Sequence, residues 1–371
     1  MPTEVPWKGS RPVQVDWGTR HSLVLDEEGS VWEAGKPGSK AYRPFTFRRV
    51  PKLPLITMVA AGVDHSAALD VEGSLWVWTK KKGLTWASQY PRKIGINSPL
   101  SKVACGDDFL VGESEEGLLV LGNNSQGQLG LGHCKAQFEG PALVQVNELS
   151  KGPLRSLTAF YGGTVLVDSE GELFFSGDTS YGQYVPSGAP ACSSVFKRIM
   201  PGIPPILGVT CGLFHALALD ETGGVWSWGA DGFNLPSNTP GFRSHPVRVT
   251  SLEGVRDVVA GAYHSLAFPS EGGLLVFGRN SYGQLGLDHC TDLELPTICD
   301  FQPSLPHCWF NRQKSARPIG GANDKRDFIS FGKRDLSTRE TTSIPSKILR
   351  TEEESRLSGP KPVVNEECVS T

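Results

Sequence analysis

The sequence predicts an all-β fold in which one small antiparallel sheet is repeated along the chain. The first observation is a segment of the form V-x-x-G-x-x-H-S-x-x-L-D-x-x-G-x-V-W-x-W-G, which recurs six times in the 371 residues at a spacing of roughly fifty. A repeat of this length indicates one unit that is copied and packed against itself. The second observation is the high count of glycine, 43 residues, which together with Trp, Val and Leu suits short strands joined by tight turns.

Each copy contains two apolar runs separated by a turn. The turn holds a glycine, such as Gly29 or Gly223, which adopts positive φ angles without steric cost. This pattern predicts two antiparallel strands joined by a tight turn. The four clear copies and the two divergent ones begin, respectively, at Val15, Val59, Val209 and Val259, and at Val103 and Leu157.

A polar, glycine-rich loop and a later strand complete each unit. The fullest loops are 123–130, NNSQGQLG, and 280–286, NSYGQLG, and proline introduces the later strand, as in 141–144 and 246–249. Four short antiparallel strands make a propeller blade, and blades must stack because one blade cannot bury both of its faces. The repeats therefore predict a β-propeller.

The expected domain covers residues 1–350. Clear repeats fill residues 10–301, and residues 302–350 are interpreted as a degenerate last blade, because 328–332, FISFG, and 345–349, PSKIL, resemble blade strands. We expect seven blades, six clear and one degenerate, although the sequence leaves open whether the ring closes with six or seven. Residues 351–371 are polar and contain proline, which predicts a disordered C-terminal tail.

The net charge and the distribution of apolar residues restrict the kinds of partner and the cellular location that we expect. The net charge is −3, which makes nucleic acid an unexpected partner, although residues 312–371 are mildly basic and leave open a chromatin or membrane-surface contact. No apolar stretch approaches the ~20 residues of a membrane helix, and the N-terminal residues lack the apolar core of a signal peptide. We therefore expect an intracellular protein, in the cytoplasm or the nucleus, with no membrane span.

The motifs quoted above resemble the RCC1 (regulator of chromosome condensation 1) repeat family, whose signature halves are G-x-x-H-S-x-x-L and W-G-x-N-x-x-G-Q-L-G. The resemblance covers residues 10–301 and implies a seven-bladed β-propeller. It does not imply one function, since the family includes exchange factors for the small GTPase Ran, ubiquitin-ligase modules, a plant ultraviolet receptor and a bacterial enzyme inhibitor.

The candidate site lies just before the recurring histidine. These positions vary between copies while the framework does not, and loops at one end of a propeller form a composite surface on a rigid body. In Ran exchange factors, the resemblance implies, acidic and histidine residues at these positions face the GTPase. Aspartates match that pattern, whereas an arginine and two aromatic residues depart from it. The candidate partner-binding residues are Arg20, Asp64, Asp107, Asp108, Phe214 and Tyr263.

No catalytic residue, cofactor or metal is predicted. The recurring histidines lie in different blades, so we expect each to satisfy polar groups near its own turn and not to share a metal ion. The spacing of Cys290, Cys299 and Cys308 does not match a zinc site, and the glycine-rich loops lack the Gly-Lys-Ser/Thr of a phosphate loop.

The sequence favours a non-enzymatic, monomeric scaffold that binds a protein partner through variable loops. The alternative is a guanine-nucleotide exchange factor for a Ran-like small GTPase, which performs no covalent chemistry. The three aspartates favour this alternative, whereas the aromatic residues and Arg20 count against it.

Overall fold

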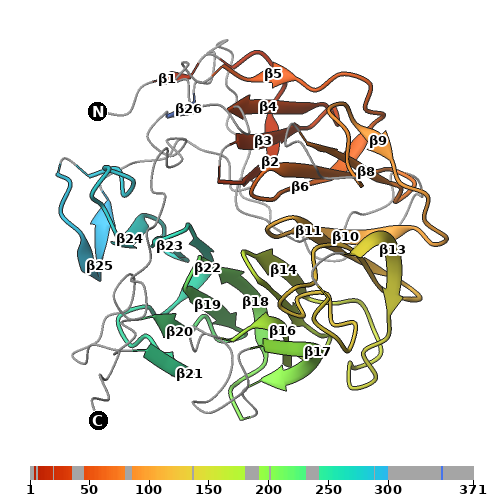
Figure 1. The fold of residues 1–371 in the computed structure, drawn as a ribbon. Helices are drawn as coiled ribbons and strands as arrows, with labels where there is room; N and C mark the ends of the chain where they lie inside the picture. The colour runs from red at the N-terminus through yellow and green to blue at the C-terminus, as the bar shows by residue number, and fades with distance from the viewer. Residues whose placement is uncertain are drawn as a thin grey trace, which may run out of the picture.

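The computed structural model describes residues 4–5, 7–19, 21–35, 46–79, 86–135, 138–179, 192–199, 202–230, 242–287, 289–299 and 344–345. They form six four-stranded antiparallel sheets and one two-stranded sheet. Figure 1 shows the six larger sheets following one another around a common centre in chain order. The predicted all-β propeller with four-stranded antiparallel blades is confirmed, and each of the six repeats forms one blade.

The first three blades each take four consecutive strands from the N-terminal half of the chain. Their strands are β2 (Pro12–Trp17), β3 (His21–Asp26), β4 (Val31–Gly35) and β5 (Arg48–Arg49); β6 (Ile56–Ala61), β7 (His65–Asp70), β8 (Leu75–Thr79) and β9 (Arg92–Lys93); and β10 (Leu100–Cys105), β11 (Phe109–Ser114), β12 (Gly117–Gly122) and β13 (Phe138–Val144).

The next three blades continue in the same order. Their strands are β14 (Ser156–Phe160), β15 (Gly163–Val167), β16 (Leu173–Asp178) and β17 (Cys192–Ile199); β18 (Ile206–Cys211), β19 (His215–Asp220), β20 (Val225–Ala230) and β21 (Phe242–Arg248); and β22 (Val255–Ala260), β23 (His264–Pro269), β24 (Leu274–Gly278) and β25 (Leu293–Cys299).

An aspartate closes the turn between the second and third strands of a blade. In the second blade, Asp70 accepts a hydrogen bond from the backbone N–H of Ser74 at 2.8 Å and another from Trp76 Nε1 at 2.9 Å. Burial acts to raise the pKa of Asp70, but these hydrogen bonds, with that from Trp76 foremost, bring it below its ordinary value. The same Asp–Trp hydrogen bond joins Asp220 to Trp226 at 2.9 Å. The D-x-x-G-x-V-W half of the repeat thus forms a turn whose aspartate is held by hydrogen bonds to the turn backbone and to the tryptophan.

The hydrophobic core lies between the blades. Five apolar clusters each combine residues of two neighbouring blades. Between the second and third blades, for example, Leu69 and Val77 pack in one cluster with Leu110 and Leu121. Because each blade buries its faces against its neighbours, the blades stabilise one another and hold their loops in fixed relative positions.

A tryptophan of the first blade contacts the sixth blade. Trp17, on β2 of the first blade, packs against the apolar cluster of the sixth blade, which contains Phe268 and Val276. A two-stranded sheet pairs β1 (Glu4–Val5) with β26 (Ile344–Pro345), and Figure 1 places it on the side of the ring between the first and sixth blades. Segments from opposite ends of the chain therefore pair beside the first and sixth blades.

The predicted seventh blade is not tested by these residues. Of its expected range, 302–350, only Ile344–Pro345 belongs to the described part of the chain, and the tail at 351–371 lies wholly outside it. Within the described segments, no helix has the length and hydrophobicity needed to cross a membrane.

Candidate partner-binding rim

The turns between the first and second strands of successive blades form a linked series at one end of the propeller, here called the rim. Among the described residues, the rim consists of 18–19, 62–64, 106–108, 161–162, 212–214 and 261–263. Backbone hydrogen bonds join neighbouring turns: Val63 N–H donates to Gly106 O at 3.3 Å, and Asp107 N–H donates to Tyr161 O at 3.2 Å. Leu213 N–H likewise donates to a carbonyl of the next turn, that of Ala262, at 3.0 Å.

Glycine begins most of these turns because a side chain there would collide with the side-chain ring three residues later and, at Gly18, Gly62 and Gly212, also with the next blade. A Cβ atom on Gly62 would lie 2.6 Å from the carbonyl oxygen of Gly106, and one on Gly212 would lie 2.5 Å from that of Gly261. Both distances are shorter than a Cβ atom tolerates. The glycine of the G-x-x-H signature therefore permits the close approach that joins adjacent rim turns.

The histidine of the signature reaches across to the next blade. His21 Nε2 lies 2.8 Å from Ser66 Oγ, and His215 Nε2 lies 2.9 Å from Ser265 Oγ, so the H-S pair of one repeat is matched by that of the next. Burial, together with the nearby His264, lowers the pKa of His215 to about 3, which keeps its imidazole neutral. The sequence indicated polar satisfaction near each turn, but it did not reveal that the serine partner comes from the following repeat.

Part of the rim is acidic. Asp107 and Asp108, in the third blade, are half-buried, and the backbone of Asp108 adopts a φ of 56°, a left-handed conformation that Asp and Asn tolerate better than most residues. Asn123 N–H donates to the carbonyl oxygen of Asp108 at 2.8 Å, so the loop after β12 supports this turn. Asp64, in the adjacent turn, is only 6% exposed, and its carbonyl oxygen accepts a hydrogen bond from Thr79 Oγ1 at 2.6 Å.

Another part of the rim is aromatic and basic. The rings of Phe214 and Tyr263 lie 5.9 Å apart, and the Arg279 guanidinium lies 5.3 Å from the centre of the Tyr263 ring. Arg279 also lies 5.6 Å from the ring of Tyr282, which is 58% exposed. Tyr263 itself is 4% exposed, so it supports the others more than it presents a surface. Tyrosine and arginine are enriched among residues that dominate protein interfaces.

The structure therefore places the predicted site residues in two sectors. Asp64, Asp107 and Asp108 lie together in an acidic sector, and Phe214 and Tyr263 lie together in an aromatic one. Arg20 lies outside the described residues. The sequence did not predict Arg279 and Tyr282, because they lie in the loop after the third strand, β24, and not in the turn before the histidine. The one indication in the sequence was the aromatic residue inside the N-S-Y-G-Q loop.

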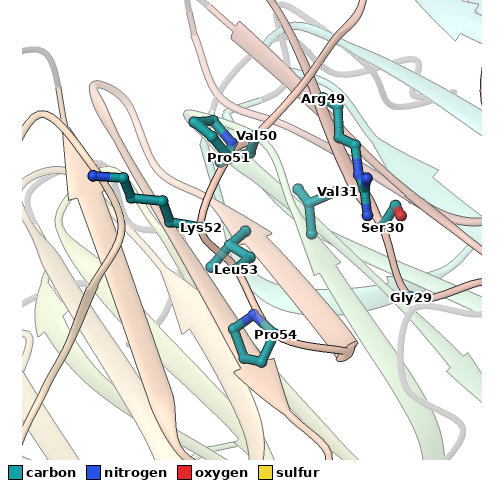
Figure 2. Close-up of a pocket in the computed structure, with 9 residues that line it drawn as sticks. All are labelled: Gly29, Ser30, Val31, Arg49, Val50, Pro51, Lys52, Leu53 and Pro54. Atoms are coloured by element: carbon teal, nitrogen blue, oxygen red, sulfur yellow. The ribbon is translucent and has the colours of Figure 1, made fainter.

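A hollow at the opposite end of the first blade brings no functional side chains together. It is lined by residues 29–31, in the turn after β3, and 49–54, before β6. In Figure 2 the Lys52 side chain points away from Arg49, so the two cations do not converge on one point. Lys52 Nζ instead lies 5.6 Å from the centre of the Tyr90 ring. Among the described residues, no three His, Cys, Asp or Glu side chains gather closely enough to hold a metal ion.

Comparison with known proteins supports the repeat assignment. The family profile for the regulator of chromosome condensation (RCC1) repeat matches residues 206–234 and 255–284. The mouse secretion-regulating guanine nucleotide exchange factor is 36% identical over 179 residues, which are 45% of this chain and 38% of that protein. The chain spans less than half of the length of the curated relatives that it matches.

Solved structures share the fold. Human WBSCR16 superposes with a TM-score of 0.71 at 20% identity, covering 82% of this chain and 86% of that one. Prp20p from Saccharomyces cerevisiae, described with its binding to Gsp1p and histones, superposes with a TM-score of 0.66 at 22% identity, covering 78% and 77%. At these identities the likeness establishes architecture alone. The chain therefore carries RCC1 repeats and has the β-propeller arrangement of RCC1-type proteins.

Proposed function

We propose that this chain is a regulator of a small GTPase that promotes release of bound guanine nucleotide, with the rim as its contact surface. The observation that carries the proposal is the similarity to the mouse secretion-regulating guanine nucleotide exchange factor, 36% identical over 179 residues. The acidic sector supports it, because carboxylates suit contact with the basic residues and Mg²⁺ that hold a nucleotide. The scaffold favoured by the sequence becomes the second candidate.

Such a regulator performs no covalent chemistry. It binds the nucleotide-free GTPase more tightly than the loaded one, and by thermodynamic linkage it weakens nucleotide binding by the same factor. The blades hold the rim turns through shared apolar clusters and turn-to-turn hydrogen bonds. A surface organised in this way before binding loses little conformational entropy when it captures the nucleotide-free state.

The proposed roles of the candidate residues follow their exposure. Asp107, Asp108 and Phe214 are half-buried and contact the GTPase directly. Asp64 and Tyr263 are buried and hold the turns that present those contacts. Arg20 belongs to the rim by its sequence position, between β2 and β3.

The experiment measures release of a fluorescent GDP analogue from Ran, and in parallel from small GTPases of other subfamilies, with and without the full chain. We expect micromolar protein to accelerate release from one of them. Asp107→Asn and Asp108→Asn remove charge without changing shape, and Asn tolerates the left-handed backbone at position 108. Each is expected to lower the rate roughly tenfold, the effect of losing a strong interface contact.

The matched control is Glu115→Gln, which removes an exposed carboxylate at the opposite end of β11. This variant is expected to retain the full rate. If no GTPase releases nucleotide faster, or if all three variants behave alike, exchange through the acidic sector is wrong.

The second candidate function is a binding module without exchange activity. The aromatic sector favours it, because the exposed Tyr282 and the half-buried Arg279 form a group of the kind that anchors protein partners. Tight binding of a GTPase or another protein, lost in Tyr282→Ala and unaccompanied by nucleotide release, would select this function.

We further propose that β1 and β26 belong to a seventh sheet that completes the ring, and that the protein acts as an intracellular monomer. The pairing of Glu4–Val5 with Ile344–Pro345 supports the first point. Deletion of residues 1–5 is expected to lower the melting temperature, whereas an unchanged value would contradict the proposal. Light scattering at micromolar concentration tests the monomer.

A further inference from the structure

Two cysteines from different blades meet beside the rim. Cys134 lies in the loop after β12 of the third blade and is exposed, whereas Cys192 begins β17 of the fourth blade and is half-buried. Their Sγ atoms are 3.0 Å apart, although 58 positions separate them in the sequence. Both are free thiols. The distance is about 1 Å longer than a disulfide bond, so a small movement joins the two atoms.

The surrounding structure holds the pair in place. Asn124 Nδ2 donates a hydrogen bond to the carbonyl oxygen of His133 at 2.6 Å, which anchors the residue next to Cys134. Gly132 N–H donates to Ser194 O at 2.7 Å, which ties the same loop to β17 two residues beyond Cys192. Cys134 is therefore presented to Cys192 by a loop that already bridges the two blades.

We propose that Cys134 and Cys192 form a reversible disulfide that joins the third and fourth blades. A low-molecular-weight disulfide such as oxidised glutathione supplies the oxidant. A thiolate from the pair attacks one glutathione sulfur and expels glutathione. The second cysteine then displaces the other glutathione, so two thiols are oxidised and one disulfide is reduced.

The same contact connects this disulfide to the acidic sector of the rim. The loop that bears Cys134 begins at Asn123, whose N–H supports Asp108, and the fourth blade supplies Tyr161, whose carbonyl oxygen binds Asp107 N–H. A covalent bond here limits the movement of the third blade against the fourth. It therefore stiffens the turns that carry the proposed contacts of the GTPase regulator.

The pair is expected to react slowly with disulfides at neutral pH. Partial desolvation of its sulfur, followed by the hydrogen bond with Cys192 and the charge of that residue, raises the pKa of Cys134 to about 11. A thiol with so high a pKa carries little thiolate at neutral pH and reacts slowly. The rate of disulfide formation is accordingly expected to rise between pH 7 and pH 9.

The experiment treats the full chain with oxidised glutathione, blocks the remaining thiols, and maps disulfides by mass spectrometry without reduction. We expect a peptide that links Cys134 to Cys192, which disappears with dithiothreitol and is absent in Cys134→Ser and Cys192→Ser. Cys290→Ser removes another exposed thiol, on the sixth blade, and is expected to leave the linked peptide unchanged.

A second measurement compares melting temperatures. Oxidation is expected to raise the melting temperature of the wild-type chain and of Cys290→Ser by several degrees, because the bond closes a long loop, but not that of Cys134→Ser. Glutathione attached separately to the two cysteines, with no linked peptide, would overturn the proposal. These readouts do not depend on nucleotide exchange, so their failure is distinct from failure of the proposed function.

Discussion

Mild acid is expected to destabilise the propeller through its interblade histidines. His215 is fully buried against the sixth blade, where burial and the neighbouring His264 lower its pKa from 6.5 to about 3. The unfolded chain therefore binds a proton at this imidazole between pH 6.5 and pH 3, whereas the folded chain does not. A lowered histidine pKa means that stability is complete above pH 6.5 and is lost as the pH falls below it.

The magnitude follows from the same values. Between pH 7 and pH 5, a group with a pKa of 6.5 in the unfolded chain and about 3 in the folded chain costs about 2 kcal/mol of unfolding free energy. Burial also lowers the pKa of His264, to about 4, and adds up to about 2 kcal/mol, since this residue keeps partial exposure. Protonation of the turn aspartates lowers stability only below about pH 4, so the change in stability between pH 7 and pH 5 reports on the histidines.

The assay is urea unfolding followed by tryptophan fluorescence at pH 7 and pH 5. The informative variant is His215→Phe, because Phe109 occupies the equivalent position of the third blade and is fully buried there. At pH 7 the variant is expected to lose about 1 kcal/mol of unfolding free energy, because Ser265 no longer has its histidine partner. When the pH falls to 5, the variant is expected to lose about 2 kcal/mol less than the wild type does. An equal loss on acidification in both proteins would refute the reasoning.

Two further predictions concern the repeat signature. Gly62→Ala is expected to lower the free energy of unfolding by about 1–3 kcal/mol in urea, because the new Cβ meets both the His65 ring and the next blade. Gly208→Ala, where nothing lies within 4 Å of the new Cβ, is expected to change it little, and equal effects of the two substitutions would contradict the close-approach argument. Asp220→Asn turns an amide donor toward Trp226 Nε1–H and is expected to lower the free energy of unfolding by about 1–3 kcal/mol. The loss is expected to be smaller when Trp226 is already replaced by Phe, and strictly additive losses in this double-mutant cycle would show that the pair is not coupled.

The fold was predictable because its signals are local and repeated. Each blade takes its four strands in chain order, so a hairpin that is recognisable at Gly73 or Gly223 recurs at the same place in the next repeat. Even the divergent third and fourth copies form blades of the same order. The contact between the first and sixth blades was less predictable, because Trp17 meets residues that are far apart from it in sequence.

The positions of the candidate residues in the propeller were predictable from the sequence, but their grouping was not. Their shared position just before the recurring histidine register placed Asp107 and Phe214 at the same end of the propeller, since equivalent turns lie at equivalent ends of their blades. Their grouping into an acidic and an aromatic sector depends on which blades are neighbours. The contribution of Arg279 depends on a loop that follows a different strand, and periodicity gives no information about that packing.

The amino-acid order alone determined that this chain makes repeated hairpins, because turn glycines, alternating apolar residues and the aspartate anchor act over a few positions. Only the tertiary structure decided which side chains meet between blades. The serine partner of His215 lies fifty positions away, and Cys134 and Cys192 are separated by 58. Those contacts arise from how whole sheets stack around the ring, and no short stretch of residues encodes that arrangement.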